Sequence, residues 1–499
     1  MGVKRMNYCI NGEWVPSKTD KYMPITDSST GEVIAEVPSC TKEEVLAAIA
    51  SAQEAFPAWS ALSISKRTQY MFTWRDVLIK HKEELSQLCA KELGKTIGEA
   101  RGDVQKAIEP TELACAIPDL LQGETSMNVT TGYDTATYKA PLGVVAGIVP
   151  MNFPAMIPWG WMVPVAIATG NTVVLKANSQ TPLTSMRMLE LFYEEAHFPK
   201  GVVNLVTCGR QEADILLKDE RIKAVTFVGT TKVGKEVYSV AAAHGKRVQS
   251  QTEAKNHALL LEDADLESAT NAIVNSTYGC AGMRCMALPV IVVQDSIADK
   301  FVALLKQKAQ AMKIGAAYDE DTKLGPVVSA KHKESVLNWI QKAELVLDGR
   351  DVKVPGLENG FFVGPTIFDH VTKDMSIGDC EIFGPVTCIK RVKNYEEGIA
   401  IMNANPFANG SAIFTQSGYY ARRFAMETDG GMVGINVGIP VPTAYFPFSG
   451  NKDSFFGDLH VLGRDGVRFF TRAKTVTTHW FDEKSAHREV RTWEGSTDV

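Results

Sequence analysis

Apolar residues recur at helical spacing over the first hundred residues of this chain and gather in short, unbroken runs after that. The spacing predicts an amphipathic helix from Thr41 to Ala55, with Thr41 as the N-cap and Glu44 completing a capping box. A second apolar stripe predicts one continuous helix from Arg67 to Ala90. We expect short strands before these helices and a region dominated by helices up to about residue 120.

Unbroken apolar runs of strand length then alternate with helical segments. They predict strands at 144–149, 172–176, 202–206 and 224–228, with helices at 156–169 and 186–196. Strands that are apolar on both faces and separated by helices are typical of a parallel sheet covered by helices. We therefore expect a doubly wound α/β sheet, which binds its ligand at the carboxyl ends of its strands.

A second α/β unit is expected after residue 258, with a helix at 265–276, a strand at 289–293 and a helix at 298–312. Two further segments, 133–138 and 473–480, alternate polar and apolar residues as strands do. Neither segment is expected to be stable alone, so we expect them to pair with each other and with another subunit.

Composition narrows the class of protein. The 499 residues include 45% apolar and 22% charged residues, which is ordinary for a soluble globular protein, and the net charge of −6 gives no sign of nucleic-acid binding. The most apolar run, 144–167, contains four prolines, which argues against a membrane helix. Nine cysteines without a CxxC pair, and no histidine cluster, indicate free thiols, no metal site and a cytoplasmic location.

The segment from Tyr278 to Ala287 contains the clearest candidate for a catalytic residue in the chain. It contains Cys280 and Cys285 among glycines and alanines, and Arg284 stands directly before the second cysteine. Small neighbours allow a ligand to approach the backbone, and a guanidinium favours the nucleophilic thiolate. Cys285 is therefore the candidate nucleophile, whereas Cys280 is expected to serve packing.

The Gly-x-Arg-Cys-x-Ala segment around Cys285 resembles the nucleophile motif of the aldehyde dehydrogenase superfamily, and the resemblance extends over residues 8 to 481. It implies that Cys285 attacks an aldehyde carbon and carries the acyl group as a thioester. The segment 150–154 resembles the asparagine loop of that family. There, the Asn152 amide and the Cys285 N–H would stabilise the oxyanion of the tetrahedral adduct.

The same resemblance implies a nicotinamide cofactor. The segment 227–234 is similar to the phosphate-binding segment, with Gly229 at the end of a strand and Gly234 in the first turn of the next helix. The motif that begins at Glu381 matches the nicotinamide side, where Glu381 would hold the ribose and Phe383 would pack near the ring.

The adenosine end of the cofactor leaves NAD and NADP as alternatives. Lys176 ends a strand that resembles the one whose lysine meets the adenine-side ribose. NAD-preferring members usually have a glutamate three residues later, which repels a 2′-phosphate, but Ser179 stands there in this chain. Lys176 could then help to bind the phosphate of NADP, so the cofactor is expected to be NAD or NADP.

One departure from the family pattern changes the expected chemistry. Most members carry a glutamate that activates water for thioester hydrolysis, and Gln251 occupies that position. A glutamine cannot accept the proton at neutral pH. The segment 254–257, Ala-Lys-Asn-His, and the absent glutamate both resemble the coenzyme A-acylating (methyl)malonate-semialdehyde dehydrogenases. Coenzyme A is then the expected acyl acceptor.

In that branch two arginines bind the substrate carboxylate. Arg284 matches one of them, and the other aligns with Lys106, which keeps the charge but loses the bidentate fork. The expected substrate is malonate or methylmalonate semialdehyde, converted to acetyl-CoA or propanoyl-CoA with loss of CO2. The alternative is a non-acylating dehydrogenase of a carboxylated or sulfonated aldehyde, for which Glu253 is the nearest candidate base. A catalytically silent structural protein is the third interpretation, and the intact Cys285 argues against it.

The resemblance also implies an aldehyde dehydrogenase-like α/β fold. It predicts an NAD(P)-binding domain from residues 1–125 and 146–257, and a catalytic domain from 258–450. A small β oligomerisation extension would come from 126–145 and 466–485, and the assembly is expected to be a homodimer or homotetramer.

Overall fold

The first of two large sheets has eight strands, in the order β22-β12-β11-β8-β9-β10-β2-β3, in a computed structural model that describes residues 3–340 and 345–480. The five strands from β12 to β10 run parallel, and the strands beyond them at both edges are antiparallel to their neighbours. The bounds are β2 (Tyr8–Ile10), β3 (Glu13–Val15), β8 (Val144–Ile148), β9 (Thr172–Lys176), β10 (Val203–Val206), β11 (Ile222–Val228), β12 (Arg247–Gln251) and β22 (Phe455–Gly457). The four predicted strands are confirmed as β8 to β11.

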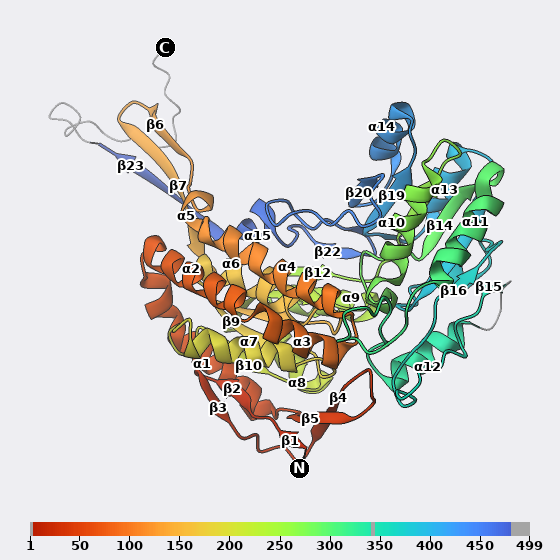
Figure 1. The fold of residues 1–499 in the computed structure, drawn as a ribbon. Helices are drawn as coiled ribbons and strands as arrows, with labels where there is room; N and C mark the ends of the chain where they lie inside the picture. Colours follow the sequence, from red (N-terminus) through yellow and green to blue (C-terminus); the bar gives the residue numbers. More distant parts are fainter. Residues whose placement is uncertain (1–2, 341–344, 481–499) are drawn as a thin grey trace.

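Helices from the first half of the chain cover this sheet (Figure 1). They are α1 (Lys42–Ala61), α2 (Ile64–Lys80), α3 (Lys82–Leu93), α4 (Ile97–Cys115), α5 (Ile117–Leu120), α6 (Val163–Ala168), α7 (Leu183–Glu194), α8 (Arg210–Lys218) and α9 (Thr231–Ala243). The capping box is confirmed, because the Thr41 N–H donates to Glu44 Oε2 at 2.8 Å and the Glu44 N–H donates to Thr41 Oγ1 at 3.4 Å.

Two predicted helices differ from the structure. The helix expected from Arg67 to Ala90 is broken at His81, whose φ of −99° and ψ of 12° leave the helical region. The His81 ring contacts Glu84 at 2.7 Å and Glu195, beyond the end of α7, at 2.8 Å, so tertiary contacts accompany this corner. The helix expected at 156–169 begins as a π-helical segment, Ile157–Met162, before α6, and each piece has a proline in its first turn.

The second large sheet has seven strands, in the order β15-β16-β17-β14-β13-β19-β20, and all of them are parallel to their neighbours except β15. Their bounds are β13 (His257–Leu260), β14 (Val290–Gln294), β15 (Leu345–Leu347), β16 (Thr366–Phe368), β17 (Val386–Val392), β19 (Gly410–Phe414) and β20 (Met432–Ile435). The helices of this part are α10 (Leu266–Tyr278), α11 (Asp295–Gln310), α12 (Ala330–Trp339), α13 (Tyr395–Ala404) and α14 (Gly418–Glu427). The predicted α10, β14 and α11 are therefore present.

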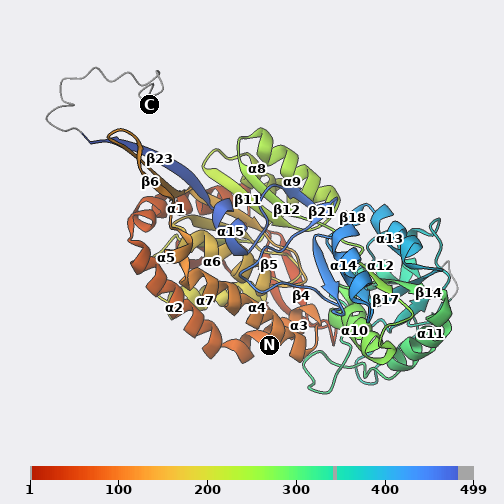
Figure 2. The same cartoon turned by 90° about the horizontal axis from the view of Figure 1, so that it is seen from above.

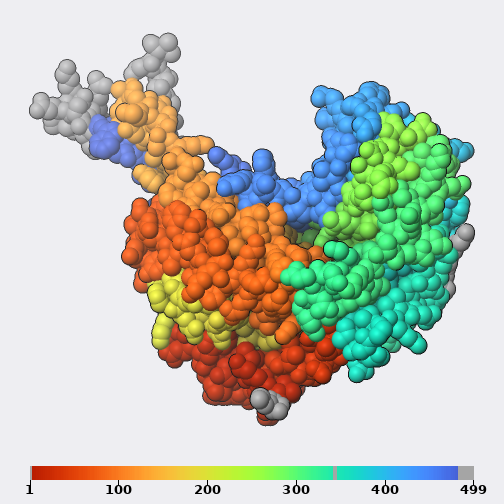
Figure 3. Space-filling model, viewed as in Figure 1, coloured from red at the N-terminus to blue at the C-terminus, as the bar shows by residue number. Residues whose placement is uncertain are grey.

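A three-stranded arm projects from the body of the molecule (Figures 1 and 3). It consists of β6 (Thr125–Thr130), β7 (Tyr133–Pro141) and β23 (Thr471–His479), and β23 pairs with β7 antiparallel along its full length. The expected pairing of the two extension segments is confirmed, and pairing with another subunit stays a prediction. The smaller elements are β1 (Lys4–Arg5), β4 (Tyr22–Thr26), β5 (Val33–Pro38), β18 (Phe407–Ala408), β21 (Asn451–Lys452) and α15 (Gly463–Phe469).

The two large sheets lie side by side, and the chain crosses between them at the end of β12 and the start of β13 (Figure 2). Strand β22, from near the C-terminus, returns to the first sheet. The proposed domain boundaries stay a prediction.

Among the described residues, no helix is long and apolar enough to cross a membrane, and no cluster of three histidine, cysteine or acidic side chains could hold a metal ion.

Candidate active site

The loop that carries Cys285 begins with a left-handed turn at the end of α10. Cys280, Ala281 and Gly282 have φ values of 50°, 51° and 75°. Left-handed conformations at residues other than glycine cost roughly 1–3 kcal/mol each and persist only where surrounding contacts enforce them. A Cβ on Gly282 would lie 2.0 Å from the Gly384 carbonyl oxygen, so only glycine allows this close approach to the segment after Glu381.

Glu99 supplies contacts that hold this turn. Its Oε1 accepts hydrogen bonds from the Cys280 N–H at 2.8 Å and from Arg284 Nη2 at 2.9 Å. Its Oε2 accepts the Thr96 N–H at 3.0 Å and so forms the capping box at the start of α4. One carboxylate therefore links the first turn of α4 to the loop that carries the candidate nucleophile.

Arg284 is engaged inside the protein. Besides its ion pair with Glu99, Arg284 Nε donates to Cys280 Sγ at 3.2 Å. Burial opposes its charge, but Cys280 and Glu99 together keep the pKa of Arg284 above its ordinary value. Arg284 lines a pocket together with Asn256 and Glu381, and Nη1 makes no hydrogen bond among the described residues. The role of Arg284 at a substrate carboxylate stays a prediction.

Cys285 lies where the backbone of its loop is tightly held. Burial raises the pKa of its thiol to about 12, and the nearby Glu381 carboxylate adds to this rise. The backbone N–H groups of Cys285 and Met286 act in the opposite direction and lower the pKa of the thiol, as the charge of Arg284 does. The thiol is therefore the resting form at neutral pH, and its activation depends on groups that favour the anion.

Two asparagine side chains hold the carbonyl oxygen of Cys285. Asn256 Nδ2 donates to it at 2.8 Å and to the Ala287 carbonyl oxygen at 2.8 Å, and Asn409 Nδ2 donates to the Cys285 oxygen at 3.1 Å. Both side chains are almost fully buried. Sequence reasoning missed Asn409 and Glu99 as parts of this site, although the spacing Thr96-x-x-Glu99 is a visible capping signal.

Asn152 reaches the same loop from the first sheet. Its buried amide donates to the Met283 carbonyl oxygen at 3.2 Å. The loop after it is fixed by Asp103, which accepts the Met156 N–H at 2.7 Å and pairs with buried Lys95 at 3.0 Å. The structure thus brings Asn152 next to the cysteine loop, and its role at an oxyanion stays a prediction.

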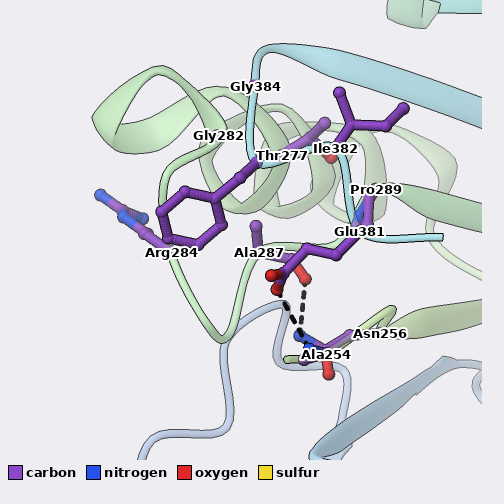
Figure 4. Close-up of a pocket in the computed structure, with 11 residues that line it drawn as sticks. Ala254, Asn256, Thr277, Gly282, Arg284, Ala287, Pro289, Glu381, Ile382 and Gly384 are labelled. Atoms are coloured by element: carbon purple, nitrogen blue, oxygen red, sulfur yellow. Dashed lines mark hydrogen bonds between the residues drawn. The ribbon is translucent and has the colours of Figure 1, made fainter. Parts of the chain in front are cut away.

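Glu381 faces the same pocket from the second sheet (Figure 4). Its Oε1 accepts the Ala254 N–H at 3.0 Å, and burial raises its pKa to about 8. Phe383, two residues further, has a positive φ of 60°, and its carbonyl oxygen accepts a hydrogen bond from His332 Nε2 at 2.8 Å. Glu381 and Phe383 therefore line the same pocket as Arg284 and Asn256.

The predicted phosphate segment lies at the carboxyl end of β11. The Gly229 N–H donates to the Gln251 carbonyl oxygen at 3.1 Å, and a Cβ on Gly234 would lie 2.2 Å from Thr252 Cγ2, so Gly234 allows α9 to pack closely. Glu253 Oε2 accepts the Thr231 N–H at 2.8 Å at the start of α9. A side chain thus already occupies one donor of this helix terminus, which the sequence did not predict.

Lys176 and Ser179 follow β9 at the same edge of the sheet. Lys176 Nζ makes no hydrogen bond or ion pair within the described part of the chain, and burial lowers its pKa. Such a cation without an internal partner fits a ligand with hydroxyl or phosphate oxygens. Ser179 is partly exposed nearby and adds no negative charge. These residues fit the adenosine end of a nicotinamide dinucleotide, and their roles stay predictions.

Gln251 and Lys106 complete the set of predicted positions. Gln251 Nε2 donates to the Phe448 carbonyl oxygen at 3.3 Å, and its Oε1 is buried without a partner among the described residues. Lys106 lies on α4, where its Nζ pairs with Glu109 at 2.8 Å and its side chain is 38% exposed. The role of Lys106 beside Arg284 at a substrate carboxylate stays a prediction.

The chain belongs to the aldehyde dehydrogenase family, since the family model matches residues 14–476. Malonate-semialdehyde dehydrogenase 2 of Oceanobacillus iheyensis is 47% identical over 483 residues, which cover 96% of this chain and 99% of that protein. Malonate-semialdehyde dehydrogenase 1 of Geobacillus thermodenitrificans is 46% identical over 485 residues, with 96% and 99% covered.

Solved structures agree with this assignment. The methylmalonate-semialdehyde dehydrogenase of Oceanimonas doudoroffii has a TM-score of 0.94 and 41% identity, covering 97% of this chain and 99% of that one. A structure from Sinorhizobium meliloti, in complex with NAD, has a TM-score of 0.94 and 39% identity, covering 96% and 99%. The predicted fold is therefore confirmed.

Proposed function

We propose that this enzyme oxidises malonate or methylmalonate semialdehyde and transfers the acyl group to coenzyme A, which gives acetyl-CoA or propanoyl-CoA with loss of CO2. The observation that carries the proposal is the neutral Gln251 at the position where most family members have a base. The malonate-semialdehyde dehydrogenases that resemble this chain over nearly its full length support the substrate class.

The side chains around Cys285 have separate roles in this proposal. The Cys285 thiolate adds to the aldehyde carbon, and the amide of Asn152 stabilises the resulting oxyanion together with the Cys285 N–H. The Arg284 guanidinium attracts the substrate carboxylate through the nitrogen that Glu99 leaves free. Lys106 contributes a positive charge at longer range.

Nicotinamide dinucleotide, when bound, supplies the acceptor for the hydride. Glu381 and Phe383 would hold its nicotinamide end, Gly229 and Gly234 its phosphates, and Lys176 with Ser179 its adenosine ribose. A protonated Glu381 can donate a hydrogen bond to a ribose oxygen as well as accept one, and its raised pKa of about 8 keeps it protonated at neutral pH.

The alternative is a non-acylating dehydrogenase that releases the free acid. It needs a base for water, and Glu253 was the candidate. Glu253 accepts the Thr231 N–H at the start of α9. One oxygen of the Glu253 carboxylate is therefore already engaged at the helix terminus. This contact favours the acylating reaction over the alternative.

Turnover of malonate semialdehyde with and without coenzyme A tests the proposal directly. We expect one rapid burst of reduced cofactor per active site without coenzyme A, followed by slow turnover, and sustained turnover when coenzyme A is added. Rapid release of malonate without coenzyme A would support the alternative instead.

We further propose that the β6–β7–β23 arm joins subunits of a cytoplasmic homodimer or homotetramer. Large apolar side chains are exposed on the arm, including Met127 at 83% and Tyr138 at 56%. Surface of this kind marks an interaction site. Light scattering after gel filtration should give an oligomer for the unmodified chain and a smaller species for a Met127→Asp, Tyr138→Asp double variant. A monomer for the unmodified chain would overturn the proposal.

A further inference from the structure

We propose that His332 is a positioning residue that holds Phe383 in a left-handed backbone conformation and thereby sets its ring for the nicotinamide of the cofactor. The inference rests on the proposed function, because it takes Phe383 as the residue that packs near the nicotinamide ring. His332 lies in the first turn of α12, outside the family motifs.

Phe383 has a backbone conformation that needs support. Its φ of 60° lies in the left-handed region, which a large side chain adopts only where surrounding contacts enforce it. A return to negative φ would redirect the bond from Cα to Cβ and move the ring. Phe383 lines the pocket of Glu381 and Arg284, so the backbone conformation determines which surface this pocket offers to a ligand.

His332 contacts both the backbone and the ring of Phe383. Its Nε2 donates to the Phe383 carbonyl oxygen at 2.8 Å, and the two rings meet edge to face, with centroids 6.2 Å apart and an interplanar angle of 77°. Because a carbonyl oxygen can only accept, Nε2 carries the proton. Burial lowers the pKa of His332, so the imidazole acts as a neutral donor at pH 7 and above.

The residue after Phe383 also packs against α12. Val336 lies one helical turn after His332, on the same face of the helix. A Cβ on Gly384 would lie 2.7 Å from Val336 Cγ1, and a Cβ on Gly282 in the cysteine loop would lie 2.0 Å from the Gly384 carbonyl oxygen. The segment 383–384 therefore lies against both α12 and the cysteine loop, which restricts its movement.

The helix turn that carries His332 is itself fixed. Ser329 is the N-cap of α12, and its Oγ accepts the His332 N–H at 3.2 Å and a hydrogen bond from Gln180 Nε2 at 3.2 Å. Gln180 follows Ser179, at the predicted adenosine end of the cofactor site. The start of α12 thus connects the segment after β9 with the segment before β17, and these two segments are predicted to hold opposite ends of the cofactor.

Loss of the His332 donor should reduce the fraction of molecules in which Phe383 is set for the cofactor. The apparent dissociation constant of a ligand rises in inverse proportion to the fraction of protein that is competent to bind it. A neutral hydrogen bond shifts such an equilibrium by about threefold to tenfold. His332→Leu keeps a side chain of similar size without a donor, and it should weaken NAD+ binding by that factor in isothermal titration calorimetry.

ADP-ribose separates the positioning of Phe383 from general damage to the site. It contains the adenosine, the two phosphates and both riboses of NAD+ but no nicotinamide. His332→Leu should therefore bind ADP-ribose as the unmodified protein does. Equal weakening of NAD+ and ADP-ribose, or unchanged NAD+ binding, would overturn the proposal.

A conservative variant and a kinetic measurement add two independent checks. His332→Gln provides a neutral N–H donor and should regain most of the NAD+ affinity, and a variant as weak as His332→Leu would contradict the inference. A change in the competent fraction should raise KM for NAD+ and leave kcat at saturating NAD+ within about twofold. A merely structural role would lower kcat at unchanged KM, because part of the enzyme would be inactive.

His244 provides the matched control. Its ring also bonds a carbonyl oxygen, from Nδ1 to Val240 at 2.8 Å, but it lies exposed at the far end of α9. His244→Leu should bind NAD+ as the unmodified protein does, and equal weakening there would contradict the inference. Weaker NAD+ binding in His332→Leu together with free-acid release independent of coenzyme A would uphold the inference while refuting the acylating function.

Discussion

Gln251 and Phe448 are joined by a single hydrogen bond, from the Gln251 side-chain amide to the Phe448 carbonyl oxygen at 3.3 Å. The other end of the amide, Oε1, is buried and meets no donor among the described residues. A buried acceptor without a protein partner is the place where a water molecule or a ligand group is expected to bind. The position is thus suited to hold water but not to deprotonate it.

Replacing Gln251 with glutamate should create hydrolysis of the thioester. The new carboxyl group can accept the proton from water, and general-base assistance is worth about a hundredfold to ten-thousandfold where the geometry is right. We expect turnover without coenzyme A to rise by about tenfold or more and to increase with pH, since burial raises the pKa of a carboxyl group. Release of free acid, as malonate or as acetate after loss of CO2, measures this, and Gln251→Asn, which stays neutral, should show no gain.

Cys285 and not Cys280 should be required for the burst of reduced cofactor. Cys280 is buried, and its sulfur accepts a hydrogen bond from Arg284, whereas Cys285 is partly exposed and lies beside Glu381. Cys285→Ala should abolish the burst, and Cys280→Ala should keep most of it with a modest loss of stability. Stopped-flow absorbance measures both, and equal loss in the two variants would contradict the assignment.

Neutralising Arg284 should weaken the binding of charged semialdehydes more than neutralising Lys106. A charge-assisted hydrogen bond contributes about 1.5–3 kcal/mol, so Arg284→Gln should raise KM for malonate semialdehyde by about tenfold or more. Lys106→Gln should have a smaller effect, because its charge already pairs with Glu109 and is partly exposed to solvent.

Propanal is the control substrate for both variants, since it has no charge to bind. An equal rise in KM for propanal and for the semialdehyde would mean that the cation has only a structural role. Because Arg284→Gln also leaves Glu99 without its partner, the melting temperature should be recorded alongside KM.

The Glu381→Gln variant should change the pH dependence of stability. Burial raises the pKa of Glu381 from 4.5 to about 8, so the native state holds a proton that the unfolded state has already lost between those pH values. The stability of the unmodified chain therefore falls as the pH rises from about 4.5 to about 8. Glutamine keeps the acceptor for the Ala254 N–H and does not titrate.

The melting temperature of Glu381→Gln, measured against that of the unmodified protein, checks this. The difference in favour of the variant should grow between pH 5 and pH 8 and stay constant above that range. A difference that is the same at pH 5 and pH 9 would show that the carboxyl group of Glu381 titrates normally.

The fold was predictable where a local sequence pattern, such as an apolar run or a capping box, matched the way those residues are buried in the folded protein. The four parallel strands β8 to β11 are apolar on both faces, and the capping box at Thr41 fixed the start of α1. The break at His81 was not predictable, because it is accompanied by contacts with Glu195, more than a hundred residues away. A local pattern of apolar residues contains no information about a contact with such a distant residue.

The site was predictable to the extent that its residues lie in short motifs. Cys285, Asn152 and Glu381 stand in such motifs, and the structure brings all three to one region. Asn409 lies just before β19 and more than a hundred residues from Cys285, and its contact with the Cys285 carbonyl depends on how the second sheet is assembled. The interaction of Glu253 with the start of α9 likewise depends on the tertiary arrangement of β12 and α9.

Glu99 bonds both the first turn of α4 and the loop before Cys285. Thermal opening of that helix turn should therefore also reduce catalytic activity. The first turn of a helix frays more easily than its middle, and local opening requires less free energy than global unfolding. When the first turn of α4 opens, Glu99 leaves the Cys280 N–H and Arg284, and the left-handed turn before Cys285 loses its support. On slow heating, catalytic activity should therefore disappear several degrees before the bulk of the protein melts.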